Sequence, residues 1–170
     1  LQIEPNSKKL KPYVQYRIGK MFCYGLGTEQ NYQKAFEWFE RSAKQKNKFA
    51  QFSLANLYYY GSGIEKDLSQ AFLWYQRSSS QGQPYAAYSI AQMYRYGEYV
   101  TKDNDTAQRY YKQALSGFLK IESDDMANDD LFYKLGQMFN LGLGTDSDVT
   151  KAIEYFRRSA EMNNKNGLFE

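Results

Sequence analysis

The chain repeats itself at a nearly fixed period, and this feature limits its fold more than any other. Four glycines mark the copies at spacings of 36, 36 and 45 residues: Gly25, Gly61, Gly97 and Gly142. An alanine follows each glycine ten residues later: Ala35, Ala71, Ala107 and Ala152. An aromatic residue precedes each glycine by nine residues: Tyr16, Phe52, Tyr88 and Tyr133. Because independent positions agree, the sequence predicts four copies of one structural unit, with a nine-residue insertion in the third.

Each copy has the pattern of two helices. In the second copy, apolar residues such as Leu54 and Tyr58 recur at spacings of three and four, which marks one face of a helix. Gly61 fits the left-handed position that ends this first helix. Asp67 fits the N-cap of a second helix, and Gln70 three residues later predicts a capping box. The matching cap positions in the other copies are Asn31, Asp103 and Asp148.

Small residues mark the place where the two helices of a copy should cross. On the first helices they are Gly19, Ala55, Ala91 and Gly136, and on the second helices they are the four repeated alanines. One helical hairpin cannot bury its apolar face alone, but stacked hairpins share a continuous core. The sequence therefore predicts an all-α fold, a right-handed α-α superhelix (solenoid) of stacked helix-turn-helix repeats.

The second copy spells the pattern A-x3-L-G/A-x2-Y-x2-G-x-G, followed by D-x3-A-x2-W-Y-x2-A/S. It is carried by Ala50, Leu54, Ala55, Tyr58, Gly61, Gly63, Asp67, Ala71, Trp74, Tyr75 and Ser78. This pattern resembles the Sel-1-like repeat, a relative of the tetratricopeptide repeat, and the resemblance extends from Tyr13 to Asn164. It implies a binding scaffold without chemistry of its own. Many members of the family are bacterial, and they hold signalling, secretion or cell-envelope proteins together.

The chain departs from this pattern in its third copy. Tyr99 replaces the second glycine, so we expect the turn there to be reshaped. The insertion lies between Phe118 and Asp130, so the second helix of this copy should be longer and end in an acidic loop. A further likeness, carried by "EPNSKKLKPYVQYRIGKMFCYGLGTEQ", is to the repeat tails of bacterial mobilisation relaxases.

The repeat pattern predicts where the copies begin and end. We expect a linker or irregular cap over residues 1–12, where Pro5 would interrupt the interior of a helix. The expected repeats are 13–48, 49–84, 85–129 and 130–165, and residues 166–170 would start a truncated fifth.

In a tetratricopeptide-like superhelix the first helices line the concave wall, so three rows of their residues are candidates for contact with a partner. The outer row is Tyr24, Tyr60, Tyr96 and Leu141; the middle row is Lys20, Asn56, Gln92 and Gln137; the inner row is Tyr16, Phe52, Tyr88 and Tyr133. Other positions predicted to face the same groove are Tyr13, Cys23, Phe49, Tyr59, Tyr85, Arg95, Asp130 and Asn140. Tyrosine provides a large contact area with a polar tip, and side-chain amides both donate and accept hydrogen bonds.

Burial is the alternative for some of these aromatics. We expect Trp38, Trp74, Tyr58 and Tyr94 in the core and the outer row exposed, whereas the inner row fits either the groove or the packing between helices. The sequence favours a protein or peptide as the partner, bound to a tyrosine- and amide-lined groove.

Several function classes lack the residues they need. The sequence contains no histidine, which removes the usual general base and the commonest zinc ligand, and Cys23 is its only cysteine. Its glycine pairs are explained as helix ends and not as phosphate loops. The aspartates at 124, 125, 129 and 130 are explained by helix capping and solvation. We therefore expect no enzyme, catalytic residue, cofactor or metal site.

Charge and hydropathy bear on the partner. The net charge of +3 comes from interleaved charges without a basic block, so nucleic acid is disfavoured, and no 18-residue apolar window could span a membrane. We expect a cytoplasmic location, and self-association through an exposed C-terminal repeat end would be a further contact. Two alternatives remain: a structural or oligomerisation region of a larger bacterial protein, or an accessory DNA-contacting tail of a mobilisation relaxase.

Overall fold

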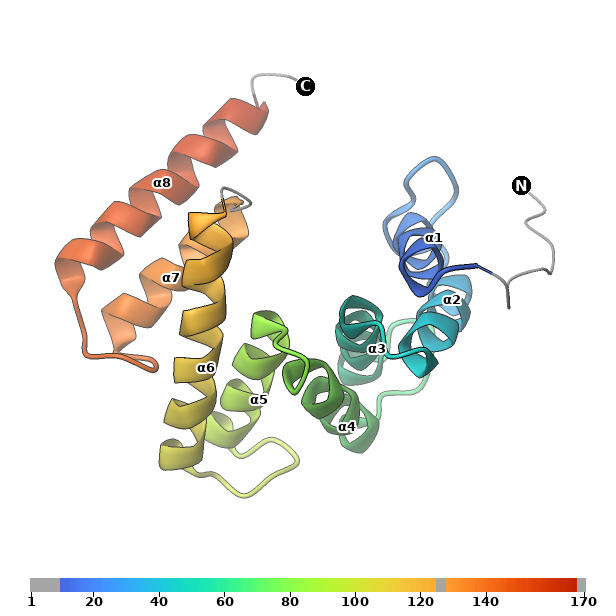
Figure 1. Ribbon diagram of the computed structural model, residues 1–170, viewed down its shortest axis with the longest axis horizontal. Helices are drawn as coiled ribbons and strands as arrows, with labels where there is room; N and C mark the ends of the chain where they lie inside the picture. The colour runs from blue at the N-terminus through green and yellow to red at the C-terminus, as the bar shows by residue number, and fades with distance from the viewer. Residues whose placement is uncertain (1–9, 125–127, 168–170) are drawn as a thin grey trace. The chain divides into compact units, whose positions relative to one another are not determined.

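A computed structural model describes residues 10–124 and 128–167, and within them it contains helices and no strands (Figure 1). The helices are α1 (Pro12–Tyr24), α2 (Tyr32–Lys44), α3 (Lys48–Tyr60), α4 (Leu68–Ser79), α5 (Pro84–Tyr96), α6 (Asn104–Ser123), α7 (Asp129–Leu141) and α8 (Val149–Gly167). The predicted all-α fold of paired helices is confirmed. The chain forms two compact units that divide between Ala86 and Ala87, and each is described by itself.

Glycines in the left-handed conformation end the first helices. Gly25, Gly61, Gly97 and Gly142 have φ values of 71°, 70°, 74° and 64°. Each donates its amide hydrogen to the carbonyl oxygen four residues back. A side chain at such a φ costs about 1–2 kcal/mol, which explains why glycine recurs at this position. The predicted helix ends are confirmed.

The second helices begin at the predicted caps. The side chains of Asn31, Asp67, Asp103 and Asp148 each accept a hydrogen bond from an amide in the first turn.

The capping box predicted at Gln70 is wrong. In a capping box the Gln70 side chain would bind the amide of Asp67. That amide instead donates to the carbonyl oxygen of Tyr58 at 2.9 Å, and the same bond recurs from the other three caps to Phe22, Tyr94 and Phe139. The turn of each copy is thus closed from both ends, by the glycine and by the cap.

The turn of the third copy is not reshaped, contrary to the prediction. Tyr99 has a φ of 65°, close to the 72° of Gly63 and the 73° of Gly144 at the matching positions. The backbone of Tyr99 therefore adopts the left-handed conformation, at a cost of about 1–2 kcal/mol, because the surrounding hydrogen bonds fix the turn. Gly97 and Asp103 close this turn as their counterparts do elsewhere.

Small residues lie where the helices of a hairpin cross, as predicted. A Cβ atom built on Gly19 would lie 2.5 Å from the ring of Phe39, and one on Gly136 would lie 2.6 Å from the ring of Phe156. The alanines at the other crossing positions are buried. Within the hairpins, α1 packs on α2, α3 on α4 and α7 on α8, and a contact between the rings of Tyr88 and Tyr111 joins α5 to α6.

In three of the hairpins, polar side chains join the two helices of the hairpin, and these contacts were not predicted from the sequence. The hydroxyls of Ser42, Ser78 and Ser159 each donate to a backbone carbonyl 30 residues back, at the start of the first helix, at 2.6–2.8 Å. In the first two hairpins a glutamine pair adds to this contact. Gln45 donates to the buried Gln15 at 2.8 Å, and Gln81 donates to the buried Gln51 at 2.7 Å. The two glutamine pairs share a spacing of 30 residues, and this spacing was the signal for them in the sequence.

The aromatic core differs from the prediction at two of four positions. Trp38 and Trp74 are buried, but Tyr58 and Tyr94 are only half-buried. The residues that precede these tyrosines, Leu57 and Met93, are buried in their place. Tyr58 meets the ring of Phe36 edge-on and Tyr94 stacks on Tyr110, so both lie at the rim of a hairpin contact.

The insertion lengthens α6, as predicted. This helix has 20 residues, against 12 or 13 in α2 and α4. Glu122, in its last turn, forms an ion pair with Arg158 of α8 and accepts a hydrogen bond from the hydroxyl of Tyr155 at 2.9 Å. Most of the predicted acidic loop (125–127) lies outside the described residues.

The ends of the chain add two observations. Helix α8 continues to Gly167, so residues 166 and 167, where the sequence predicts a fifth repeat, belong to this same helix. Residues 1–9 and 168–170 lie outside the described part of the chain. Among the described helices, none combines the length and apolar character needed to cross a membrane.

Candidate functional site

The outer row consists of the last residue of each first helix, and all four side chains are exposed. Tyr24, Tyr60, Tyr96 and Leu141 are 63%, 71%, 63% and 53% exposed. The glycine that follows each of them turns the chain away from the helix, so no later residue of that helix covers the ring. The exposure predicted from the sequence therefore agrees with the structure.

The middle row is half-buried and partly engaged within its own hairpins. The side-chain oxygen of Asn56 accepts a hydrogen bond from the hydroxyl of Tyr75 at 2.6 Å. The Gln92 side chain forms a hydrogen bond with the hydroxyl of Tyr88. The ammonium group of Lys20 lies 5.6 Å from the centre of the Tyr24 ring. Two amides of this row are thus engaged within their own hairpins, although Asn56 keeps its amide hydrogens as donors.

Most of the inner row belongs to the packing between helices. Tyr16 of α1 stacks on Phe49 of α3 with 5.8 Å between ring centres, and burial raises its pKa to about 12. Phe52 lies 6.0 Å from the ring of Tyr85, and Tyr88 lies against Tyr111. In the fourth copy, by contrast, Tyr133 is 50% exposed. In the first three copies the inner row therefore takes part in the packing between helices and is half-buried.

The remaining candidates surround these rows. Tyr59 is half-buried and meets Tyr60 edge-on, with 4.9 Å between ring centres. The guanidinium group of Arg95 lies 5.6 Å from the ring of Tyr96. Burial raises the pKa of the half-buried Cys23 thiol, which disfavours the reactive thiolate. Gln137 is half-buried on α7, one helical turn before Leu141 of the outer row.

The acidic cluster before α7 differs in detail from the expectation. The cap is Asn128, whose side chain accepts the amide of Leu131 at 2.9 Å. Asp129 and Asp130 lie in the first turn, where negative charge favours the helix dipole, and Asp130 pairs with Lys134 at 2.9 Å. In residues 10–124 and 128–167, no group of three Cys, Asp or Glu side chains converges as metal ligands would.

Comparisons with known proteins agree on one repeat family. The model for the Sel1 repeat matches residues 12–47, 48–83, 84–117 and 133–164. A Sel1 repeat protein from Oxalobacter formigenes has a similar structure, with a TM-score of 0.68 and 26% identity over 94% of this chain and 61% of that one. A protective antigen of uropathogenic Escherichia coli with an SLR fold gives a TM-score of 0.60 and 23% identity, over 92% of this chain and 39% of that one.

These comparisons also set limits. The chain spans about three fifths of the first of these proteins and two fifths of the second. The similarity to the second supports the fold alone. None of the curated proteins matches the sequence.

Proposed function

The chain belongs to the Sel1 repeat family, and on that premise we propose that it is a non-catalytic scaffold that binds a partner polypeptide through its first helices. Sel1 repeat proteins are generally protein–protein interaction modules. The finer part of the proposal is the surface that binds the partner. The cytoplasmic location of the protein stays a prediction.

The outer row carries this proposal. Three first helices place a tyrosine at the same exposed position, two in the unit that ends at Ala86 and one in the other unit. Exposed aromatics are ordinary when they are scattered, but here three hairpins carry one at the same structural position. Tyrosine is enriched among the residues that dominate binding energy, since it buries a large area and keeps a hydroxyl for hydrogen bonds.

The surrounding residues support the outer row in different ways. Tyr16, Phe52 and Tyr88 hold neighbouring helices in place beneath the surface, through the ring contacts described above. Lys20, Asn56, Gln92, Arg95, Gln137, Tyr59 and Tyr133 are the proposed polar and aromatic contacts around it. The rings of Tyr59 and Tyr60 already pack against each other, so this pair would lose little side-chain entropy on binding.

A double substitution tests the surface. Tyr60→Ala/Tyr96→Ala removes one outer-row ring from each unit. The matched control is Leu73→Ala/Leu119→Ala, which removes exposed apolar side chains from second helices in the same two units. Each variant is used as bait in a lysate of the source cells after circular dichroism has shown equal folding.

We expect a partner that wild type and the control capture and the tyrosine variant loses. A partner that all three capture equally would contradict the proposed surface.

Self-association is a second candidate, favoured by one observation. Val149 and Ile153 of α8 are exposed, whereas Phe36, at the place of Ile153 in the first copy, is covered by the ring of Tyr58 from the next repeat. A second copy of the chain could cover α8 in the same way. Light scattering should then show a dimer for wild type and a monomer for Ile153→Asp, and a wild-type monomer at high concentration would exclude it.

A further inference from the structure

Acidic residues are absent from three of the first helices. Helices α1, α3 and α5 contain no Asp or Glu, but they carry Arg17, Lys20, Lys48 and Arg95. In the second helix α2, two of the three cations are paired with acids of the same helix: Arg41 with Glu37 at 3.9 Å and Lys44 with Glu40 at 2.8 Å. The third, Lys34, lies over the ring of Phe22. Helices α1 and α3 thus carry positive charge without acids of their own, although the net charge of the chain is only +3.

In the unit that ends at Ala86, the cations of α1 and α3 contact aromatic groups and a backbone carbonyl. Arg17 donates to the hydroxyl of Tyr13 at 3.4 Å. Lys48 lies 5.5 Å from the ring of Phe49 and donates to the carbonyl of Gln81 at 3.4 Å. Lys20 lies over Tyr24. None of the three forms an ion pair with a carboxylate among the described residues.

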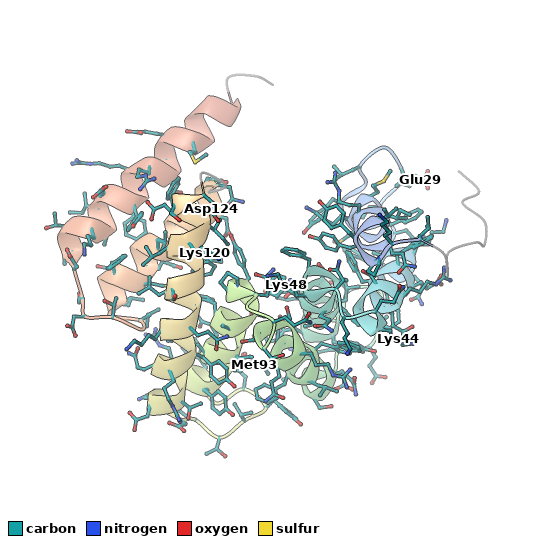
Figure 2. The ribbon with its side chains drawn as sticks, viewed as in Figure 1. Glu29, Lys44, Lys48, Met93, Lys120 and Asp124 are labelled. Carbon is teal, nitrogen blue, oxygen red and sulfur yellow. The ribbon has the colours of Figure 1, made fainter. Side chains whose placement is uncertain are left out.

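The rings of Tyr13, Tyr16 and Phe49 contact each other in sequence, and they connect the exposed groups of α1 with those of α3 in a shared surface. We call it the α1–α3 surface, made of Tyr13, Arg17, Lys20, Tyr24, Lys48, Phe49 and Tyr60. Lys48 marks this surface, and Lys44 of α2 lies on a different side of the same unit (Figure 2). Glu29, labelled in Figure 2, lies in the loop after α1 and not on the helix itself.

We propose that the α1–α3 surface binds an acidic segment of the partner polypeptide. Carboxylates of that segment pair with Arg17, Lys20 and Lys48, and its apolar side chains pack on the exposed rings of Tyr13 and Phe49. Unpaired cations at the edge of an aromatic surface favour a partner of opposite charge, through both faster encounter and stronger contact. This inference rests on the proposed function and names the chemistry of the partner.

Nucleic acid is the competing polyanion. Aromatic rings with cations also bind single strands, but such sites have a basic track that follows the phosphates. Here α1 and α3 carry only three cations between them, Arg17, Lys20 and Lys48, and Asn56 adds a side-chain amide donor suited to a peptide backbone. The surface therefore fits a polypeptide better, and an oligonucleotide is included in the test.

The test selects peptides from a random display library on the full chain at about 0.1 M salt, where surface charges still interact. The most enriched peptide is then synthesised with a fluorescein label, and its Kd is measured by fluorescence anisotropy. The variants are Lys20→Glu/Lys48→Glu and the control Lys44→Glu/Lys46→Glu, which has the same change in charge on α2 and the turn after it. A labelled single-stranded oligo-dT is measured in parallel.

We expect the enriched peptides to carry an excess of Asp and Glu. Binding should be about tenfold weaker or more in the Lys20/Lys48 variant and within about twofold of wild type in the control. Lys20→Gln/Lys48→Gln should give an intermediate loss, since it removes the attraction without adding repulsion.

Enrichment of neutral or basic peptides, or no enrichment at all, would overturn the acidic preference. If neutral peptides lose affinity in Tyr60→Ala, the proposed function stands and only this inference fails. Tighter binding of oligo-dT than of any selected peptide would assign the surface to nucleic acid and overturn both.

Discussion

Two separate physical requirements favour glycine at the second glycine position of the turns, and Gly27 and Gly63 distinguish them. Gly27 and Gly63 have nearly the same left-handed φ, 70° and 72°. A Cβ atom on Gly27 would meet nothing within 4 Å, whereas one on Gly63 would lie 2.5 Å from Cβ of Tyr32 and 2.8 Å from its backbone carbon. Conformation alone accounts for Gly27, and the close approach of the preceding repeat adds to it at Gly63.

We therefore predict unequal costs for the same substitution. Gly27→Ala should lower the free energy of unfolding by about 1 kcal/mol, through the left-handed backbone alone. Gly63→Ala should cost about 2–4 kcal/mol, since α2 must also move away from the turn. Urea unfolding followed by circular dichroism measures both. Equal losses would show that the approach to Tyr32 is not tight.

Residue-scale features of the turns were predictable only in part. The glycines and caps follow from the local backbone conformation, which a short stretch of sequence determines. The capping box and the reshaped turn were wrong, because the cap amide of Asp67 binds a carbonyl of the preceding helix and the same closed turn holds Tyr99 in place. Those contacts depend on how the two helices meet, which local sequence does not report.

At the scale of elements, the lengthened α6 connects the third repeat to the fourth. Glu122 reaches two side chains of α8, and Arg158 also lies 4.0 Å from the centre of the Phe132 ring of α7. Burial, together with the hydrogen bond to Glu122, raises the pKa of Tyr155 to about 12. The extension thus holds the last hairpin against α6.

We predict that Glu122→Ala releases this contact. The loss in unfolding free energy should be about 1–2 kcal/mol, limited by the partial exposure of Arg158. Hydrogen exchange should show faster opening of α8 amides and unchanged protection of α3. Glu161→Ala, which removes an exposed acid of α8, is the control and should change neither the stability nor the exchange. Uniform loss of protection in both helices would mean that Glu122 acts on the whole fold.

The pairing of helices could be predicted from the sequence. The residues that face the core could not always be predicted. Tyr58 and Leu57 are neighbours on one helix, and a spacing of three and four residues accommodates both. The structure buries Leu57 and leaves Tyr58 against Phe36 at the rim. The contact of Glu122 with α8 was not predictable either, because it joins segments over 30 residues apart that are brought together by packing.

At the scale of the whole molecule, the repeats share what they need for packing and differ on the surface that we propose for binding. Glycines, caps and buried alanines recur in all four copies. The middle row contains Lys20, Asn56, Gln92 and Gln137, and the outer row changes from tyrosine to Leu141 in the last copy. Such variation at constant geometry is typical of solenoid proteins, which present a long surface for partners.

The measurement that tests this account most directly is site-specific photo-crosslinking. A photoreactive phenylalanine analogue replaces Tyr60, and in a second protein it replaces Leu73, which is exposed on the second helix of the same hairpin. After irradiation in the source cells, we predict a crosslinked partner from position 60 and none from position 73. Crosslinks from position 73 with none from position 60 would contradict the central claim that the first helices carry the binding surface.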